Sequence, residues 1–284
     1  MAKQLICALI LSGLTDAVIG MSDYLFHLAN SLVGRFWIVD NLIALPVDNE
    51  FIKAALLGSC FLAVWFGQKT EEETRRVRKI LLATLIACLF VIATTKTLSK
   101  TIFLPRPFIQ SKLVYHLQDE QLVENHRLSY RVPLDKSSQD SYRDLLNGEI
   151  ARNDLGSFPS DHAGFFVTVA AGIWLASRGV GLIALAWTFF VILFGRVMTG
   201  MHSPLDIIAG AAIGITILAL VQFITRKWFG GWLERVVNWS LQHSAMASAI
   251  LFAVLFEVSN TLVHLPPLAK FGIATVKHLL GKGN

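Results

Sequence analysis

Long apolar stretches separated by short polar segments dominate the chain. The stretches that approach the roughly 20 residues a helix needs to cross a bilayer are residues 51–68, 80–98, 163–178, 179–198, 205–225 and 244–264. None of them alternates with a period of two, and each is too long for a buried strand. Because backbone groups in lipid must be satisfied within their own segment, we predict an all-α, polytopic membrane helix bundle with about six transmembrane helices plus interfacial helices.

Weaker patterns occupy the two ends of the chain. Residues 4–20 are apolar but short and contain Asp16, so a first span, an interfacial helix and a cleaved signal segment all stay open. Residues 22–45 mix apolar and charged positions, which predicts a helix lying in the membrane interface. The tail at 266–284 places lysines among apolar residues, a fainter version of the same pattern.

The basic residues predict the orientation of the chain. They concentrate at 69–79, at 226–235 and at the turn near Arg178. Short basic loops favour the cytoplasmic side of a membrane, and all three fall on one face if the spans alternate. The opposite face then receives 99–161 and the turn at 199–204.

These patterns divide the chain into three parts. An amino-terminal apolar and interfacial segment covers 1–50, and a core covers 51–225 with a non-cytoplasmic loop at 107–158. The remaining part, 226–284, holds an extra carboxy-terminal span and an amphipathic tail.

The composition agrees with a membrane protein. Only 16% of the 284 residues are charged and 54% are hydrophobic, whereas a soluble domain carries about 25% charged residues. This excludes a disordered chain, a coiled coil and an ordinary cytosolic domain.

The cysteines, Cys7, Cys60 and Cys88, lie in apolar runs and are interpreted as small buried hydrophobic residues. The net charge of +5 allows nucleic acid, an anionic membrane surface or an anionic substrate as partner, so the positions of the charges must decide.

Chemically active side chains collect on the predicted non-cytoplasmic face. They come from three separate stretches, and they are Lys100, Arg106, Ser160, Asp161, His162, Arg196, His202 and Asp206. Guanidinium groups match phosphate oxygens, and Ser160 is a predicted N-cap at a helix start, where backbone N–H groups bind anions. Asp206 follows His202 by four residues, so one helical turn brings a carboxylate to the imidazole and fixes its tautomer.

Each of these residues alone has an ordinary structural explanation. An arginine near a span end usually snorkels to the interface, a serine before a helix is usually a cap, and a single histidine is usually structural. Ionisable groups at span ends are costly, however, and their convergence favours a phosphate site over nucleic-acid binding. For Glu257, inside the last apolar run, lining a groove and pairing within the bundle are equally open.

The order and spacing of these residues resemble a known family. The type 2 phosphatidic acid phosphatase superfamily has a signature of three motifs. The first is an Arg-Pro pair after an upstream lysine, the second is Pro-Ser-x-His, and the third is Arg-x5-His-x3-Asp. Here the three motifs are Lys100…Arg106-Pro107, Pro159-Ser160-Asp161-His162 and Arg196…His202…Asp206. The resemblance covers roughly residues 50–225.

The sequence departs from the family pattern at two positions. Lys100 lies one residue too close to Arg106, because Ser99 occupies the position of the family's lysine. Asp161 replaces the usual glycine of the second motif, which keeps the backbone N–H at the helix start. The aspartate variant is similar to the undecaprenyl pyrophosphate phosphatase branch.

The resemblance implies roles for the matching residues. His202 attacks phosphorus and forms a phosphohistidine, Asp206 orients it, and His162 gives a proton to the leaving group. The implied substrate-binding residues are Lys100, Arg106, Ser160, Asp161 and Arg196. It further implies a membrane lipid phosphate as substrate, no cofactor or metal, and a multi-pass position in a bacterial-type cytoplasmic membrane with the active site facing outward. The oligomeric state is left open.

Several functions share this constellation. The first is hydrolysis of a lipid phosphate or pyrophosphate, with undecaprenyl pyrophosphate, phosphatidylglycerophosphate, phosphatidic acid and lipid A as candidate substrates. The second is phosphotransfer from the same phosphohistidine to a hydroxyl group. The third, a transporter or binding protein that holds an anion, has no need of an oriented nucleophile. Vanadate-dependent halogenation, known elsewhere in the superfamily, ranks lowest.

Overall fold

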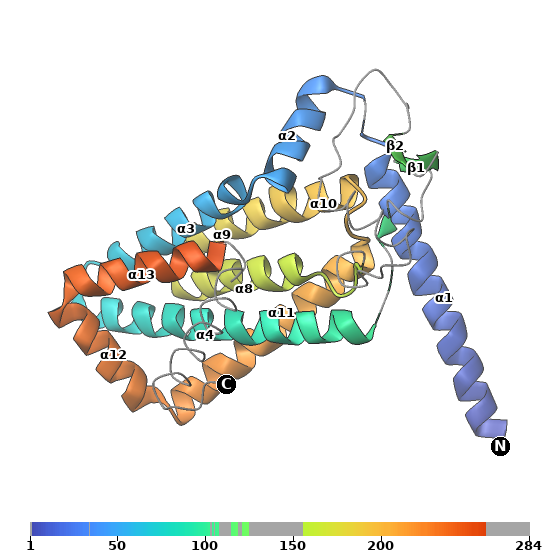
Figure 1. Ribbon diagram of the computed structural model, residues 1–284. Helices are drawn as coiled ribbons and strands as arrows, with labels where there is room; N and C mark the ends of the chain where they lie inside the picture. The colour runs from blue at the N-terminus through green and yellow to red at the C-terminus, as the bar shows by residue number, and fades with distance from the viewer. Residues whose placement is uncertain are drawn as a thin grey trace, which may run out of the picture.

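Helices form almost all of the part of the chain that the structure describes (Figure 1). The computed structural model describes residues 2–33, 35–102, 104, 106–107, 115–118, 121–124 and 156–259. Its elements are α1 (Ala2–Asn30), α2 (Trp37–Asp48), α3 (Glu50–Phe66), α4 (Glu71–Thr101), β1 (Tyr115–Gln118), β2 (Gln121–Glu124), α8 (Asp161–Ala176), α9 (Arg178–Trp187), the π-helical segment η1 (Thr188–Leu193), α10 (Phe194–Met198), α11 (Pro204–Lys227), α12 (Gly230–Gln242) and α13 (Ser244–Ser259). The predicted helical fold class is confirmed.

The two strands lie inside the predicted loop at 107–158. β1 and β2 pair antiparallel, with Tyr115 opposite Glu124 and Gln118 opposite Gln121. Residues 108–114, 119–120 and 125–155 of that loop, and the tail at 266–284, lie outside the described residues.

Helices α4, α8 and α11 pack against one another at the centre of the bundle. The contact between α8 and α11 is close because glycines face it. A Cβ atom added at Gly210 would lie 2.2 Å from the carbonyl oxygen of Ser160, and one at Gly214 would lie 2.4 Å from that of Gly164. Small residues let helix backbones approach in this way in membrane proteins. The glycines therefore bring the beginnings of α8 and α11 together.

Substitution of Gly210 by alanine is expected to disturb this contact. The added methyl group meets backbone atoms of the α8 start, which cannot move aside without shifting the helix. We expect a loss of about 1–3 kcal/mol of stability, as for other overpacked cores. Gly58→Ala is the matched control, because no atom beyond the adjacent backbone of its own helix lies within 4 Å of its added methyl group. Thermal unfolding in detergent measures both variants, and a Gly210→Ala protein as stable as Gly58→Ala would contradict the packing argument.

Three helical segments are long and apolar enough to cross a membrane. They are Glu71–Thr101, Arg178–Met198 and Pro204–Lys227. The pair α12–α13 qualifies as a fourth only as one span bent by 115°. Phe51–Phe66 and Asp161–Ala176 are apolar but shorter. The described residues thus support three to four membrane-crossing helices by length and composition, and the predicted number of about six is not confirmed.

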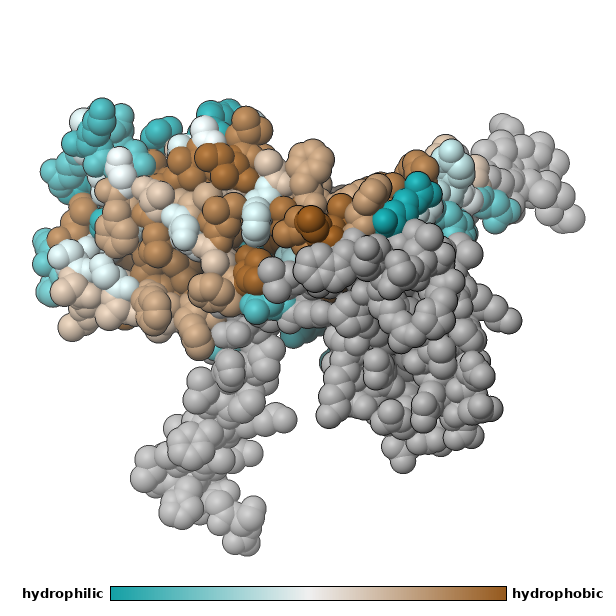
Figure 2. Space-filling view, turned by 90° about the horizontal axis from the view of Figure 1, so that it is seen from above, coloured by the Kyte–Doolittle hydropathy of each residue, from teal (hydrophilic) through white to brown (hydrophobic). Residues whose placement is uncertain are grey.

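The outer surface of the bundle is apolar. Large hydrophobic side chains remain exposed on several helices, among them Leu182, Phe190, Ile208 and Phe252. Figure 2 shows apolar side chains over the middle of one face and hydrophilic ones gathered at its left end. A continuous apolar surface of this kind fits the hydrocarbon of a bilayer.

The basic segment at 69–79 is a helix start and not a loop, which corrects the prediction. Thr70 caps α4 by accepting a hydrogen bond from the Glu73 N–H at 3.2 Å, so the helix begins at Glu71, before all basic residues of the segment except Lys69. Arg75 and Lys79 both pair with Glu234 of α12. The basic end of α4 is therefore joined to the polar face of α12.

The predicted boundary near residue 22 is also wrong. The helix α1 continues through this boundary, because no proline interrupts the segment. It ends at Asn30. Ser22 accepts a hydrogen bond from the Leu205 N–H at 3.1 Å, and the Asn30 side chain donates to the Met198 carbonyl at 2.7 Å. The end of α1 thus packs on the segments that precede and begin α11.

Candidate active site

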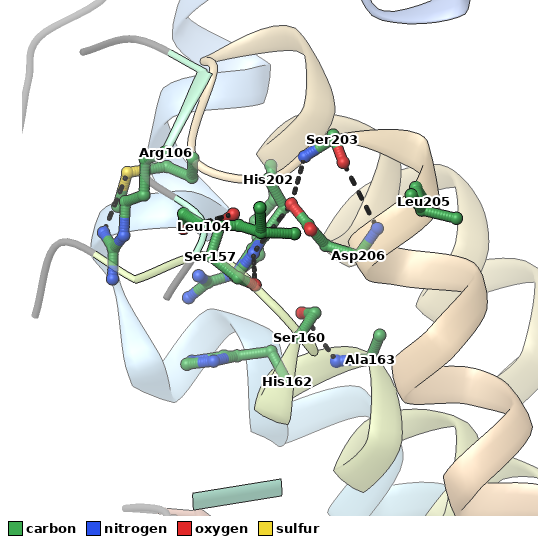
Figure 3. A network of polar contacts seen from close by, with 12 residues as sticks. Leu104, Arg106, Ser157, Ser160, His162, Ala163, His202, Ser203, Leu205 and Asp206 are labelled. Carbon is green, nitrogen blue, oxygen red and sulfur yellow. Dashed lines mark hydrogen bonds and ion pairs between the residues drawn. The ribbon is translucent and has the colours of Figure 1, made fainter. Parts of the chain in front are cut away.

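Three segments that lie far apart in the sequence meet where α8 and α11 begin and α4 ends (Figure 1). The Ser160 N–H donates to the Asp206 carbonyl at 3.1 Å, which joins the two helix starts. The Ser157 N–H and hydroxyl both donate to the Leu104 carbonyl, at 2.7 and 3.0 Å. Figure 3 shows Arg106, His162 and His202 gathered there from the three segments.

His202 is placed by a tight turn after α10. Gly200 has a φ of 78°, a left-handed conformation that favours glycine. The turn allows the N–H groups of Met201 and His202 to donate to the Arg196 carbonyl, at 3.0 and 3.2 Å. The imidazole is 3% exposed, and its Nδ1 lies 3.0 Å from the Ser157 carbonyl oxygen. Because a carbonyl only accepts, Nδ1 carries the proton, and Nε2 of the neutral ring keeps a free lone pair.

Asp206 is near His202 but hydrogen-bonds elsewhere. Its Oδ2 accepts from the Ser203 N–H at 2.6 Å, and its N–H donates to the Ser203 hydroxyl at 3.2 Å, which makes a capping box at the start of α11. The same Oδ2 lies 3.9 Å from His202 Nδ1, within ion-pair but not hydrogen-bond distance. The Ser157 carbonyl is thus the nearer partner of the ring, and Asp206 acts on it electrostatically.

The surroundings keep His202 neutral. Burial, followed by the positive charges of Arg196 and Arg106, lowers the pKa of the His202 imidazole well below its usual range. An unprotonated ring at neutral pH is the form that acts as a nucleophile.

His162 lies in the first turn of α8 with Asp161 beside it. Its Nδ1 is 2.7 Å from Asp161 Oδ1, and its ring packs on Phe166 with 6.0 Å between ring centroids. The carboxylate favours a proton on Nδ1, which leaves Nε2 to exchange protons. Sequence reasoning assigned Asp161 to substrate binding, and the structure adds this contact.

Two arginines and a helix start place groups of the kind that bind anions beside the histidines. Arg196 is 4% exposed and interacts electrostatically with both histidines and with Asp161. Arg106 is half-buried, and its positive charge helps to lower the pKa of His202. Its guanidinium group donates to the Met201 sulfur at 3.4 Å. Ser160 is the N-cap of α8, as predicted, and its hydroxyl accepts from the Ala163 N–H at 3.2 Å. The N–H groups at this helix start favour an anion.

Lys100 does not join the cluster, whereas an unexpected lysine does. Lys100 is exposed in the last turn of α4, and in the described part of the chain no contact links it to the histidines. Lys53 of α3 is 1% exposed and interacts electrostatically with His162. The signal for Lys53 was available, because it is the only charge in the apolar run at 51–68. Ser157 acts through its backbone carbonyl, which no side-chain pattern reveals.

The cluster offers cation ligands but in a positively charged setting. Ligand atoms of Asp161, His162 and His202 lie within 4.8 Å of one another among the described residues. Asp161 is already bonded to His162, and Arg196 and Arg106 add positive charge to the same place. Two guanidinium groups favour a phosphate over a divalent cation.

A cavity of about 450 Å³ lies beside the cluster, between α1 and the start of α11. Its lining combines α1 side chains with those around Asp206, and it consists of Ile19, Ser22, Asp23, Phe26, His27, Leu104, Pro107, Ser157, Ser203, Leu205 and Asp206. α1 therefore forms one wall of this neighbouring cavity, a role that sequence reasoning did not assign to it.

Comparison with known proteins identifies the family. The PAP2 superfamily matches residues 76–229, more than half of the chain. The chain belongs to the PAP2 superfamily. Its members are phosphatases, so membership agrees with a site built to hold phosphate. The matched region contains all three motif segments but begins after Lys53.

A curated relative supports the assignment over a shorter stretch. The chain is 39% identical over 73 residues to the bacitracin transport permease protein BcrC of Bacillus licheniformis, which covers 24% of this chain and 33% of that protein. The match thus spans a third of the relative's length. No solved structure matches the chain.

Proposed function

We propose that this PAP2 protein is an integral membrane phosphatase that hydrolyses a lipid phosphate or pyrophosphate through a phosphohistidine on His202, without a metal ion. The observation that carries the proposal is a pair of histidines, the buried His202 and the half-buried His162, with fixed Nδ1 partners at 3.0 Å and 2.7 Å respectively. Each ring then presents Nε2 to the phosphate site. Pure binding needs no such arrangement.

The first step uses the lone pair of His202 Nε2. It attacks phosphorus, the bond between phosphorus and the leaving oxygen breaks, and that oxygen takes the proton from Nε2 of His162. As positive charge develops on His202, the Asp206 carboxylate at 3.9 Å and the Ser157 carbonyl stabilise it.

The second step regenerates the enzyme. Water gives a proton to Nε2 of His162 and attacks the phosphohistidine, which releases inorganic phosphate and neutral His202. Arg196 and Arg106 neutralise the phosphoryl oxygens in both steps, the role that metal ions have in other phosphatases.

The membrane topology that we propose has about six crossings: α3, α4, α8, the segment from α9 to α10, α11 and α13. At about 1.5 Å per residue, the shorter α3 and α8 span most of a bilayer core of about 30 Å. The basic ends at Arg75 and Arg226 then face the cytoplasm. The site faces outward in a bacterial-type cytoplasmic membrane, within a core at 51–225.

The test is phosphate release by the full-length protein purified in detergent. It is offered undecaprenyl pyrophosphate, phosphatidylglycerophosphate, phosphatidic acid and lipid A separately, with and without EDTA. We expect release from at least one lipid, at a rate that EDTA leaves unchanged. Release from none of the four would contradict the proposal, and loss of activity in EDTA that added metal restores would contradict its metal-free form.

The name of the Bacillus relative, a bacitracin transport permease, raises transport as a competing function. The two activities separate in one experiment, in which the protein is reconstituted in vesicles with the best lipid phosphate. A phosphatase converts the lipid to its dephosphorylated product, whereas a transporter moves it between leaflets with its phosphate intact.

Phosphotransfer is a further alternative. Labelled phosphate recovered on an added alcohol acceptor would indicate it.

A further inference from the structure

Two polar side chains of α1 contact the segment that carries His202. The end of α1 lies beside α10 and the start of α11 (Figure 1). The Asn30 amide donates to the Met198 carbonyl at 2.7 Å, and the Ser22 hydroxyl accepts from the Leu205 N–H at 3.1 Å. Met198 is the last residue of α10, and Leu205 is the second residue of α11. The two contacts therefore lie on either side of the turn that holds His202.

Ser22 and Asn30 belong to one face of α1. They are separated by about two helical turns, and Phe26 lies midway between them. All three side chains are buried, whereas the neighbouring Tyr24 and Leu28 are exposed. Polar groups on a buried helix face need hydrogen-bond partners, and here the backbone around the His202 turn supplies them.

The end of α10 depends on Asn30 for one of its hydrogen bonds. A helix leaves its last four carbonyl groups without partners inside the regular helix. The carbonyls of residues 195, 196 and 197 accept from N–H groups of residues 199–202. The fourth carbonyl, that of Met198, accepts from Asn30. Met198 is 1% exposed, so removal of this donor would leave a buried acceptor unsatisfied, which is unfavourable.

The start of α11 depends on Ser22 in the same way. The first position of this helix is a proline, which has no N–H to satisfy. The N–H groups of Asp206 and Ile207 donate to the hydroxyl and the carbonyl of Ser203. The N–H of Leu205 donates to Ser22. The third motif thus satisfies its own backbone except at one group on each side of His202, and α1 provides both missing partners.

We infer that Asn30 and Ser22 are positioning residues that hold the His202 turn in its reactive geometry, so that α1 is part of the active site although it lies outside the family match at 76–229. The inference rests on the proposed function for the role of His202. Loss of either partner releases one end of the turn, and the imidazole then shifts from the Ser157 carbonyl that holds its Nδ1 at 3.0 Å. Both residues act through the turn, and we assign neither a contact with substrate.

The experiment compares Asn30→Leu and Ser22→Ala in the full-length protein, with Ser31→Ala as the matched control. Leucine keeps the number and branching of the side-chain atoms of asparagine but cannot donate, and alanine cannot accept. Ser31 follows Asn30 directly, and its hydroxyl donates to the Leu28 carbonyl of α1 itself at 2.7 Å.

Both variants are expected to lower kcat for the lipid phosphate about tenfold or more, because small displacements of a reacting group cost rate steeply. We expect KM to stay within about twofold of the wild type, since Arg196 lies inside α10. Ser31→Ala is expected to keep the wild-type kcat. All rates are measured below the unfolding temperature of each variant, so that loss of folded protein does not contribute.

Nuclear magnetic resonance of protein labelled with ¹⁵N at histidine gives a second readout that needs no turnover. The shifts of the ring nitrogens report which of them carries the proton, and the His202 signals are those that His202→Ala removes. We expect the Nδ1-protonated tautomer in the wild type and a mixture of both tautomers in the two variants. A purely structural role would lower the unfolding temperature and leave tautomer and kcat of the folded protein unchanged.

The outcomes are separable from those of the proposed function. If no lipid offered is hydrolysed, the tautomer of His202 still decides on Asn30 and Ser22. A variant that keeps the wild-type kcat and the wild-type tautomer overturns the role of its residue. If Asn30→Leu does not fold, Asn30→Ala takes its place, and Ser22→Ala decides on the contact of α1 with the start of α11 by the same measurements.

Discussion

Replacement of His202 by alanine is expected to lower phosphate release from the best lipid substrate by about a thousandfold or more, since we assign the nucleophile to no other described residue. The ring is buried, its Nδ1 is fixed by the Ser157 carbonyl at 3.0 Å, and its removal leaves the Arg196 carbonyl bonds of the turn intact. The measurement is kcat/KM for the lipid phosphate. Binding of inorganic phosphate is a second readout, and we expect the variant to retain it.

His243→Ala is the matched control for this variant. His243 is an exposed histidine at the end of α12, where it stacks on Trp239. We expect its substitution to leave kcat/KM within about twofold of the wild type, as for surface changes that touch no special feature. A His202→Ala protein that released phosphate as fast as His243→Ala would exclude His202 as the nucleophile.

Replacement of Arg196 by methionine is expected to lower kcat/KM by about 100- to 1,000-fold, the range measured when one charge-stabilising donor is removed from a transition state. Methionine fills much of the volume of the arginine stem, so packing around the 4%-exposed side chain is largely kept. The lost guanidinium is the group that interacts with both histidines and with Asp161. Steady-state kinetics with the lipid phosphate measure the effect.

A buried arginine of the same bundle supplies the control. Arg78 lies over Trp65 at 4.8 Å and donates to the Ser240 hydroxyl at 2.9 Å, among the contacts that join α4, α3 and α12. Arg78→Met is expected to lower the unfolding temperature while leaving kcat/KM of the folded protein nearly unchanged. Equal losses of activity in the two variants would indicate a general effect of removing a buried charge and would count against a specific role of Arg196.

The sequence predicted the helices well and their ends less well. Long apolar runs mark most helices of the bundle, because lipid leaves the backbone little choice. The start of α4 was placed too late because hydropathy ignores capping: Thr70 begins the helix in a polar segment. The boundary near residue 22 was misplaced because a change of composition was taken for a change of structure. Helix lengths of 16 and 17 residues for α8 and α3 leave the number of crossings open to experiment.

The motif residues could be predicted because their spacing is local. Ser160 and Ser203 cap the helices that the motifs begin, and Asp206 follows His202 by one turn. The partners that orient the two rings were not predictable in the same way. The Ser157 carbonyl is a backbone group, and its position depends on how the segment before α8 packs against Leu104.

Lys53 illustrates a different limit. Its isolation in an apolar run was visible, but its distance in sequence from the motifs concealed where it points. Only the folded bundle brings it within electrostatic range of His162. Lys100 was favoured instead because it lies close to Arg106 along the chain.

The central claim is that His202 forms a covalent bond to the phosphoryl group. Rapid chemical quench with a lipid carrying labelled phosphate, followed by mass spectrometry at alkaline pH, tests it most directly. We predict acid-labile phosphate on His202 within the first turnover. Steady release of phosphate with label on no residue, or on a residue other than His202, would contradict the account.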